Sequence, residues 1–318
     1  MDRYLITGAT GYVGSMLARR ILSDGQALSV LVRDSTRLDQ DILSGAEVLQ
    51  ADIMDREALD RIVRSYDYII HCAAPTRSAY MLSNPVEVVG AIVTGTENLL
   101  KLACRCSVKS MVYLSSMEVY GQIDCSDGRR VQEDELGYID VSDARSCYPL
   151  GKLMAEGLCH FYCAEYHVPV RIARLAQTFG RGIRLEDNRV FAQFASSVRN
   201  SSDIILHTAG DSMGNYCSID DTVEAILVIL KKGEVSEAYN VVNEANTMRI
   251  RDMAQLVAEK VAKGGIKVRY DIQDRAHLGY AANTGLRLSG EKLRKLGWEA
   301  TRSLEEMYRE MLEEQTNS

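Results

Sequence analysis

Short apolar runs alternate with longer amphipathic stretches through the first half of the chain. The apolar runs predict buried strands over Arg3–Thr7, Ala27–Val32, Glu47–Gln50, Tyr68–Cys72, Met111–Ser115 and Val170–Leu175. The stretches between them repeat apolar residues at helical spacing and predict helices over Val13–Ser23, Arg56–Ser65, Val86–Ala103 and Pro149–Tyr166. Strands that alternate with helices form a parallel sheet covered by helices on both faces. We therefore expect a doubly wound α/β fold.

Two later regions break this rhythm. Residues 180–214 are rich in arginine and bounded by glycines, and the chain from Ile250 onward is helical with a break at Lys263-Gly264-Gly265. At 318 residues the chain is long enough for one large domain and a smaller lobe. We expect a dinucleotide-binding domain and a smaller C-terminal substrate-binding lobe, the first over 1–175 with a return over 216–243, the second over 176–215 and 244–318.

The first predicted strand runs directly into Gly8-Ala9-Thr10-Gly11-Tyr12-Val13-Gly14, and a helix is predicted to follow. Glycines at this spacing let the backbone approach a pyrophosphate, whose charge is received by the N–H groups and positive end of the helix. A glycine triplet alone is common in loops, but its place between a strand and a helix makes it specific. We predict a sheet of the Rossmann type and a dinucleotide in contact with Gly8, Gly11, Tyr12, Val13 and Gly14.

A tyrosine and a lysine open a later predicted helix, in the segment Tyr148-Pro149-Leu150-Gly151-Lys152. Pro149 suits the first helical turn, and a spacing of four places Tyr148 and Lys152 on one helical face. A lysine ammonium beside a phenol favours the phenolate, which makes tyrosine a usable general base near neutral pH. We therefore predict that Tyr148 and Lys152 are catalytic and that both contact the cofactor.

With these motifs in order, the chain resembles an extended short-chain dehydrogenase/reductase of the NAD-dependent epimerase/dehydratase family, whose members act on nucleotide sugars. The resemblance also rests on Asp52-Ile53, His71-Cys72-Ala73-Ala74, Gly95–Leu100, Ser115–Gly121, Ile219-Asp220-Asp221 and Lys295-Leu296-Gly297-Trp298. It implies transient oxidation of a nucleotide sugar at C4 by NAD(P). Epimerisation, elimination or decarboxylation then follows, and the hydride returns to the sugar.

The resemblance also implies a role for individual residues. Tyr148 would remove the proton of a sugar hydroxyl while hydride passes to the nicotinamide, and Lys152 would hold the nicotinamide ribose and tune Tyr148. Ser116 falls on the catalytic Ser/Thr position of the family and would bind substrate. The residues that would flank the adenine or line the cofactor are Asp52, Ile53, Ala73 and Ala74.

The end of the second strand departs from the family pattern. NAD-binding members usually carry an aspartate there, whereas this chain reads Val32-Arg33-Asp34, with Arg33 19 residues beyond Gly14. An arginine suits the 2′-phosphate of NADP, and Arg37 is near enough in sequence to assist. Alternatively, Arg33 stacks on the adenine and Asp34 takes the ribose hydroxyls of NAD. We favour NADP over NAD.

Glu118 lies after the fifth strand, in a slot that carries a glutamate in the family's sugar 4,6-dehydratases and nucleotide-glucuronate decarboxylases. In dehydratases it removes the C5 proton that a C4 ketone has made acidic. Dehydratases normally have an aspartate just before it to protonate the leaving hydroxyl, but Met117 stands there. Glu118 therefore indicates C5 chemistry, whereas Met117 argues against ordinary dehydration. The alternative is a glutamate that faces solvent or caps a helix.

Other substrate contacts follow from the resemblance. Gln177 stands where many members have an asparagine that touches the sugar nucleotide, and Gly214 replaces an arginine that often holds the diphosphate. The arginines that can supply this charge instead are Arg181, Arg184, Arg189 and Arg287. We predict substrate contacts from Ser116, Gln177, Arg189 and Arg287.

Charge and composition exclude several classes of protein. The 44 acidic and 37 basic residues give a net charge of −7, which argues against nucleic acid as a partner. No apolar run approaches the roughly 20 residues of a membrane span, and the chain starts without a signal peptide, so we expect a cytoplasmic protein. The eight cysteines lack zinc-site spacing, so we predict reduced thiols and no metal.

The predicted helices Val86–Ala103 and Pro149–Tyr166 carry more apolar surface than the sheet can cover. By resemblance to the family they should pair with a second subunit as a four-helix bundle, which gives a homodimer.

Two other functions stay open. One is an NADPH-dependent reductase of a ketone or keto-sugar, which Arg33 suits. The other is a non-catalytic dinucleotide-sensing regulator, although such proteins typically lose the tyrosine–lysine pair that this chain keeps.

Overall fold

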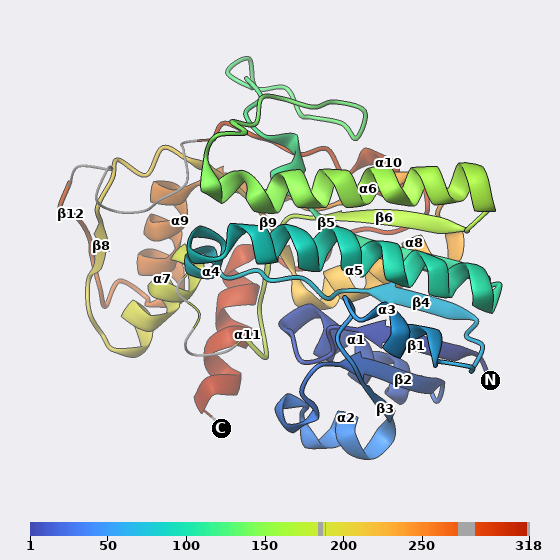
Figure 1. Cartoon of the computed structure of the whole chain (residues 1–318). Helices are drawn as coiled ribbons and strands as arrows, with labels where there is room; N and C mark the ends of the chain where they lie inside the picture. Colours follow the sequence, from blue (N-terminus) through green and yellow to red (C-terminus); the bar gives the residue numbers. More distant parts are fainter. Residues whose placement is uncertain (184–186, 188, 273–283, 317–318) are drawn as a thin grey trace.

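The computed structural model describes residues 1–183, 187, 189–272 and 284–316. Its main sheet contains seven parallel strands in the order β10-β6-β5-β4-β1-β2-β3 (Figure 1). These strands are β1 (Arg3–Thr7), β2 (Ala27–Val32), β3 (Glu47–Gln50), β4 (Tyr68–His71), β5 (Ser110–Ser116), β6 (Val170–Leu175) and β10 (Ala238–Val241). The strand order reverses between β1 and β4, and ligands bind at the carboxyl ends of strands at such a point. The predicted doubly wound parallel sheet is confirmed.

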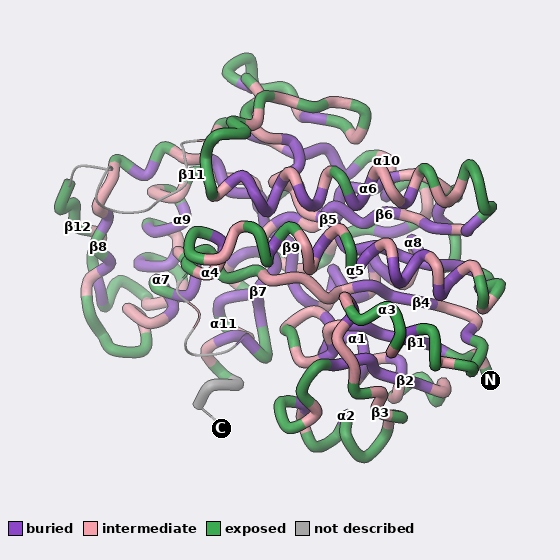
Figure 2. The backbone as a smooth tube through the Cα atoms, in the orientation of Figure 1, coloured by how far each residue is buried: buried purple, intermediate pink, exposed green. Residues whose placement is uncertain are grey.

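Two hydrophobic cores cover the two faces of this sheet, so that its strands are largely buried, apart from the edge strand β3 (Figure 2). Side chains alternate along a strand, and therefore Ile6 packs in one core while its neighbour Leu5 packs in the other. The Ile6 side is covered by α1 (Tyr12–Ser23), α2 (Gln40–Gly45) and α8 (Ile219–Lys232). The Leu5 side is covered by α3 (Arg56–Asp60), α4 (Ser78–Ser83), α5 (Pro85–Cys106) and α6 (Cys147–Tyr166).

Helix α3 is shorter than the sequence predicts. The pattern favoured a helix over Arg56–Ser65, but α3 ends at Asp60. The apolar Val63, which supported the longer helix, is 97% exposed and therefore adds nothing to the core. The remaining predicted helices and strands differ from the observed elements by three residues or fewer at each end.

A second group of elements packs beside the carboxyl edge of the main sheet. It comprises β7 (Gln177–Phe179), α7 (Val190–Arg199), β8 (Ile204–Leu206), β9 (Met213–Ser218), β11 (Asn243–Arg249), α9 (Ile250–Leu256), η4 (Val257–Val261), β12 (Val268–Tyr270) and α11 (Leu304–Thr316). Phe179 stacks on Phe191, with ring centroids 4.4 Å apart, and meets Tyr216 and Tyr308 edge-on in the core of this group. Between these elements, α8 and β10 return to the main sheet; α10 (Glu291–Arg294) packs against β10.

A buried polar network fixes the turn that follows β5. In this turn, η2 (Met117–Tyr120), the Tyr120 hydroxyl donates to Asn240 Oδ1 at 2.7 Å and accepts from Arg174 Nη1 at 3.0 Å. Arg174 also forms a buried ion pair with Glu156 of α6, with Nη2 and Oε2 2.7 Å apart. A fully satisfied buried network of this kind holds its elements in one arrangement. It therefore holds η2, α6, β6 and β10 together beneath the candidate site.

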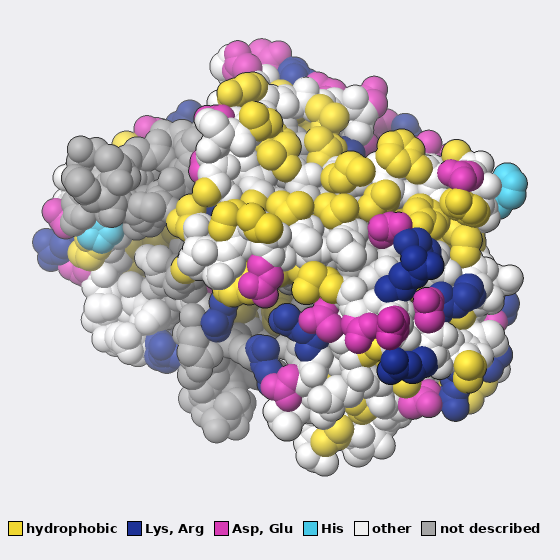
Figure 3. Space-filling view, in the orientation of Figure 1, with side chains coloured by type: hydrophobic (Ala, Val, Ile, Leu, Met, Phe, Trp, Pro, Cys, Tyr) yellow, Lys and Arg dark blue, Asp and Glu magenta, His cyan; other side chains and the backbone are white. Residues whose placement is uncertain are grey.

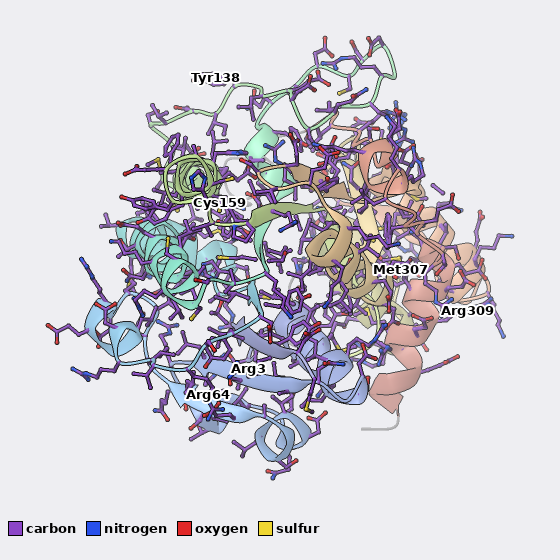
Figure 4. All side chains as sticks on the ribbon, turned by 90° about the vertical axis from the view of Figure 1, so that its right-hand side faces the viewer. Arg3, Arg64, Tyr138, Cys159, Met307 and Arg309 are labelled. Carbon is purple, nitrogen blue, oxygen red and sulfur yellow. The ribbon has the colours of Figure 1, made fainter. Side chains whose placement is uncertain are left out.

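Residues 121–143 leave the sheet as a hairpin that projects above α6, where Figure 4 labels Tyr138. Gly121 permits the sharp departure, since its φ is +59° and a Cβ there would lie 2.4 Å from the Tyr138 carbonyl oxygen.

In the described part of the chain, no helix is both long and apolar enough to span a membrane.

Candidate active site

The glycine motif forms a tight cradle between β1 and α1. Gly8 has a φ of +76°, and a Cβ there would lie 2.8 Å from the backbone nitrogen of Ala73 at the end of β4. A Cβ on Gly14 would lie 2.2 Å from the Gly8 carbonyl oxygen, so both positions require glycine. Helix α1 has Gly11 as its N-cap and no acidic residue in its first turn. This cradle fits the pyrophosphate of a dinucleotide.

The buried side chain of His71, at the end of β4, bonds to Thr7 at the end of β1, beside this cradle. His71 Nε2 lies 3.1 Å from Thr96 Oγ1, whose proton goes to the Ile92 carbonyl, so His71 donates here. His71 Nδ1 then accepts from Thr7 Oγ1 at 2.7 Å, and Thr7 Oγ1 also accepts from the Ala73 backbone N–H. Burial lowers the pKa of His71 to about 3, which keeps the ring neutral. The network fixes the segment predicted to line the cofactor.

At the ends of β2 and β3, the two carboxylates near Arg33, those of Asp34 and Asp52, have different partners. Thr36 donates to the Asp34 carboxylate through its backbone N–H at 3.0 Å and its hydroxyl at 2.6 Å, and these bonds lower the pKa of Asp34. Asp34 therefore caps the short helix η1 (Ser35–Arg37). Arg33 is 64% exposed, and its Nη1 lies 3.9 Å from Asp52 Oδ2. The two residues thus meet at the ends of β2 and β3.

Ile53 and its neighbours are held by helix α5. The Asn98 amide donates to the Ile53 carbonyl at 2.9 Å, and a Cβ on Gly95 would lie 2.5 Å from Ile53 Cδ1. Asp52 Oδ1 accepts from the Met54 backbone N–H at 2.9 Å. This close packing explains the glycine and asparagine of the Gly95–Leu100 segment.

Tyr148 and Lys152 lie in the first turns of α6, buried against the end of β5. Lys152 Nζ donates to the Leu114 carbonyl at 2.6 Å and lies 4.7 Å from the centroid of the Tyr113 ring and 5.8 Å from that of Tyr148. Burial lowers the pKa of Lys152 to about 8. Burial also raises the pKa of Tyr148, and the negative charge of Glu118 raises it further. In this chain, desolvation therefore outweighs the phenolate-favouring effect that the spacing predicts for Lys152.

Ser116 and Glu118 stand opposite Tyr148 at the carboxyl edge of the sheet. Ser116 ends β5 and caps η2, because its Oγ accepts from the Glu118 backbone N–H at 3.2 Å. A hydrogen bond from Ser116 also lowers the pKa of Tyr148. Ser116, not Glu118, caps η2; the Glu118 side chain is 37% exposed, in line with the solvent-facing alternative, and its carboxylate pairs with Arg145 Nη2 at 2.9 Å.

Sequence reasoning missed Arg145. It lies in η3 (Ala144–Ser146), directly before α6, and its guanidinium carbon is 5.8 Å from the centroid of the Tyr148 ring. The signal that was available is spacing, because Arg145 precedes Tyr148 by three residues and a helical turn therefore brings both to one side. Ser116, Glu118, Arg145 and Tyr148 form one cluster.

The predicted substrate residues reach different parts of the molecule. Gln177 begins β7, two residues beyond Leu175, whose Cα pairs with Ser116. Arg189 lies at the start of α7, and its guanidinium carbon is 4.6 Å from the centroid of the Phe191 ring. Arg189 also pairs with Asp187, with Nε and Oδ1 3.0 Å apart.

The remaining predicted arginines have other contacts. The Arg287 carbonyl accepts from the backbone N–H of Val131, in the middle of residues 121–143, at 2.7 Å. Arg181 pairs with Asp220, with Nη2 and Oδ1 2.6 Å apart, and its carbonyl accepts from the Tyr12 hydroxyl at 2.7 Å. Arg184 lies outside the described residues.

Solved structures with the same fold include nucleotide-sugar enzymes. A UDP-glucose 4-epimerase from Thermotoga maritima superposes with a TM-score of 0.85 at 21% identity and covers 99% of both chains. A dTDP-glucose 4,6-dehydratase from Streptomyces venezuelae, solved with NAD, gives a TM-score of 0.81 at 21% identity and covers 99% of this chain and 97% of its own. At these identities the likeness establishes the fold.

Relatives by sequence include UDP-glucuronic acid decarboxylase 1 of Xenopus tropicalis, which is 27% identical over 327 residues, covering 99% of this chain and 74% of that protein. The Danio rerio protein of the same name is 28% identical over 261 residues, and the match spans 82% of this chain and 61% of that one. Residues 4–242 match the NAD dependent epimerase/dehydratase family, as the sequence motifs predict. The chain therefore belongs to the NAD dependent epimerase/dehydratase family, and the expectation of an enzyme of this family is confirmed.

Proposed function

We propose that the protein binds NAD(P), oxidises a nucleotide sugar transiently at C4, and returns the hydride after a change at the sugar ring. The observation that carries this proposal is the meeting of Tyr148, Lys152, Ser116 and Glu118 at the carboxyl edge of β5, beside the glycine cradle. A buried acid–base group next to a dinucleotide cradle is what reversible oxidation of an alcohol needs.

In this mechanism the phenolate form of Tyr148 accepts the proton of the C4 hydroxyl, and the Ser116 hydroxyl donates a hydrogen bond to the same oxygen as it becomes a ketone. Lys152 binds the nicotinamide ribose and supplies positive charge beneath Tyr148. The nicotinamide, when bound, accepts and returns the hydride. Burial of Tyr148 and Lys152 excludes water from the proton transfer.

Glu118 extends the mechanism to C5. A C4 ketone makes the C5 proton acidic, and the Glu118 carboxylate is the base beside it. Elimination would require an acid to protonate the leaving hydroxyl, and the Met117 thioether has no proton to give. Decarboxylation of a sugar with a C6 carboxylate has no leaving hydroxyl to protonate: the C5–C6 bond breaks, CO2 leaves, and the bonding electrons pass to the C4 ketone as an enolate. C5 then takes a proton from solvent, which Glu118 would deliver in its protonated form before the hydride returns to C4. The decarboxylases among the relatives support this version.

The second candidate is a net reductase of a ketone or keto-sugar, which the exposed Arg33 favours because it suits NADPH. Cofactor stoichiometry distinguishes the two functions. Our proposal predicts that nucleotide sugar is converted at a constant amount of bound cofactor. Consumption of one NADPH for each product molecule would establish the reductase instead.

Cofactor choice gives a prediction at Arg33. We propose NADP, because the Asp34 carboxylate already accepts both bonds from Thr36 while Arg33 is exposed at the end of β2. Arg33→Asp should weaken NADP binding by about tenfold or more and strengthen NAD binding, since a carboxylate repels the 2′-phosphate and accepts from ribose hydroxyls. Calorimetric titration of both cofactors measures the shift. A wild-type protein that carries and binds NAD alone would contradict the NADP assignment.

We also propose a homodimer through α5 and α6. Hydrophobic side chains gather in a row on the surface over these helices (Figure 3). The exposed hydrophobic residues of the two helices include Val86, at 85% exposure, and Phe161, at 59%. A continuous exposed apolar patch marks an interaction surface. Phe161→Glu should convert a dimer to a monomer by light scattering at micromolar concentration. The matched control Leu43→Glu, on α2 across the sheet, should stay dimeric; a monomeric wild type would refute the proposal.

A further inference from the structure

Arg145 lies between two groups that the proposed function uses in different steps. Its Nη2 is 2.9 Å from both carboxylate oxygens of Glu118, and its guanidinium carbon is 5.8 Å from the centroid of the Tyr148 ring. The two partners come from different elements, Glu118 from η2 after β5 and Tyr148 from α6. Arg145 therefore links the proposed C5 base to the proposed C4 base.

Backbone hydrogen bonds fix the position of Arg145 relative to α6. The Asp143 carboxylate caps η3 by accepting from the Arg145 backbone N–H at 2.8 Å, and η3 runs directly into α6. At the start of α6, Cys147 Sγ donates to the Met81 carbonyl of α4 at 3.6 Å. The guanidinium is consequently attached to a rigid segment, one turn before Tyr148.

The Arg145 end of the ion pair is more enclosed than the Glu118 end, whose side chain is 37% exposed. The Arg145 side chain is 21% exposed, and its Nη1 is buried without a hydrogen-bond partner among the described residues. Charges near a partly buried group interact more strongly than charges that are fully exposed to water. Glu118 is therefore the main acceptor for this guanidinium in the described part of the chain.

The charges around Tyr148 oppose each other. After burial, the Glu118 charge is the largest influence that raises the pKa of Tyr148, whereas the Ser116 hydrogen bond and the charges of Arg145 and Arg189 lower it. Lys152 also packs against the ring, from the next turn of α6. A carboxylate base beside a phenol base thus has a cost: its negative charge disfavours the phenolate.

We propose that Arg145 is a positioning residue that fixes the Glu118 carboxylate at the sugar face and shields Tyr148 from its charge. The pairing lets one site hold a carboxylate base for C5 and a phenol base for C4 at the same time. This inference rests on the proposed function for the roles of Glu118 and Tyr148, but its electrostatic part is measurable without any substrate.

The direct test places 3,5-difluorotyrosine at position 148 by codon suppression. Fluorine lowers the pKa of the phenol, and the ionisation of this residue can then be followed by fluorine NMR. The cofactor-loaded protein is titrated as wild type, Arg145→Met, Arg145→Lys and the double variant Glu118→Gln/Arg145→Met. Arg145→Met should raise the midpoint by about one pH unit. Arg145→Lys should raise it less, and the double variant should return it close to the wild-type value.

The matched control is Arg129→Met, which breaks an exposed pair with Glu135 on the hairpin and should leave the midpoint unchanged. An unchanged midpoint in Arg145→Met, or a double variant that stays as high as Arg145→Met, would overturn the shielding role. With a nucleotide sugar, Arg145→Met should slow C5 proton exchange at least tenfold more than it slows cofactor reduction. A wild type that exchanges no C5 proton with any nucleotide sugar would sink the proposed C5 chemistry, while the titration still decides the electrostatic role of Arg145.

Discussion

Tyr148→Phe should lower the turnover of a nucleotide sugar by about a hundredfold or more, which is the usual contribution of a positioned acid–base group. The substitution removes only a hydroxyl, so the buried ring keeps its packing where α6 meets η2 and β5. Melting temperature and cofactor content should therefore stay at wild-type values while the rate of cofactor reduction by substrate falls. Tyr162→Phe, farther along α6, is the matched control and should retain full activity. Activity of Tyr148→Phe within about threefold of wild type would remove this residue from the mechanism.

Glu118→Gln should separate the two halves of the reaction. The glutamine keeps the shape of the side chain but is no longer a base, so C5 exchange should fall below detection while C4 oxidation continues. The variant should then accumulate reduced nicotinamide, which is visible as near-ultraviolet absorbance that does not decay. Glu135→Gln is a control in which an arginine-paired glutamate far from Tyr148 is changed. Normal turnover of Glu118→Gln would make the glutamate structural and favour plain C4 epimerisation or ketone reduction.

The fold was predictable because its strongest local signals agree with its packing. Gly8 and Gly14 mark a cradle that only glycine can form, and the apolar runs around Ile6 became the buried strands of the main sheet. The failure at α3 has a physical cause. Helical spacing around Val63 suggests a buried face, but Val63 is 97% exposed because no element among the described residues covers it, and the sequence does not report this.

The sequence predicted which residues belong to the candidate site. It did not predict their hydrogen bonds, ion pairs and pKa shifts. The spacing of Tyr148 and Lys152 places them on one face, but it does not report that Lys152 Nζ is bound to the Leu114 carbonyl or that burial dominates both pKa values. Arg145 was missed because its partner Glu118 is 27 residues away in sequence, and only the packing of η2 and η3 against α6 brings the two side chains together.

The measurement that tests the central claim most directly is incubation of the cofactor-loaded protein with a panel of nucleotide sugars in heavy water, followed by mass spectrometry and NMR. Our account predicts conversion of at least one nucleotide sugar, deuterium at C5 of the product, and an unchanged amount of oxidised cofactor at the end. Failure to convert any nucleotide sugar, or conversion that consumes one NADPH per product without label at C5, would contradict it.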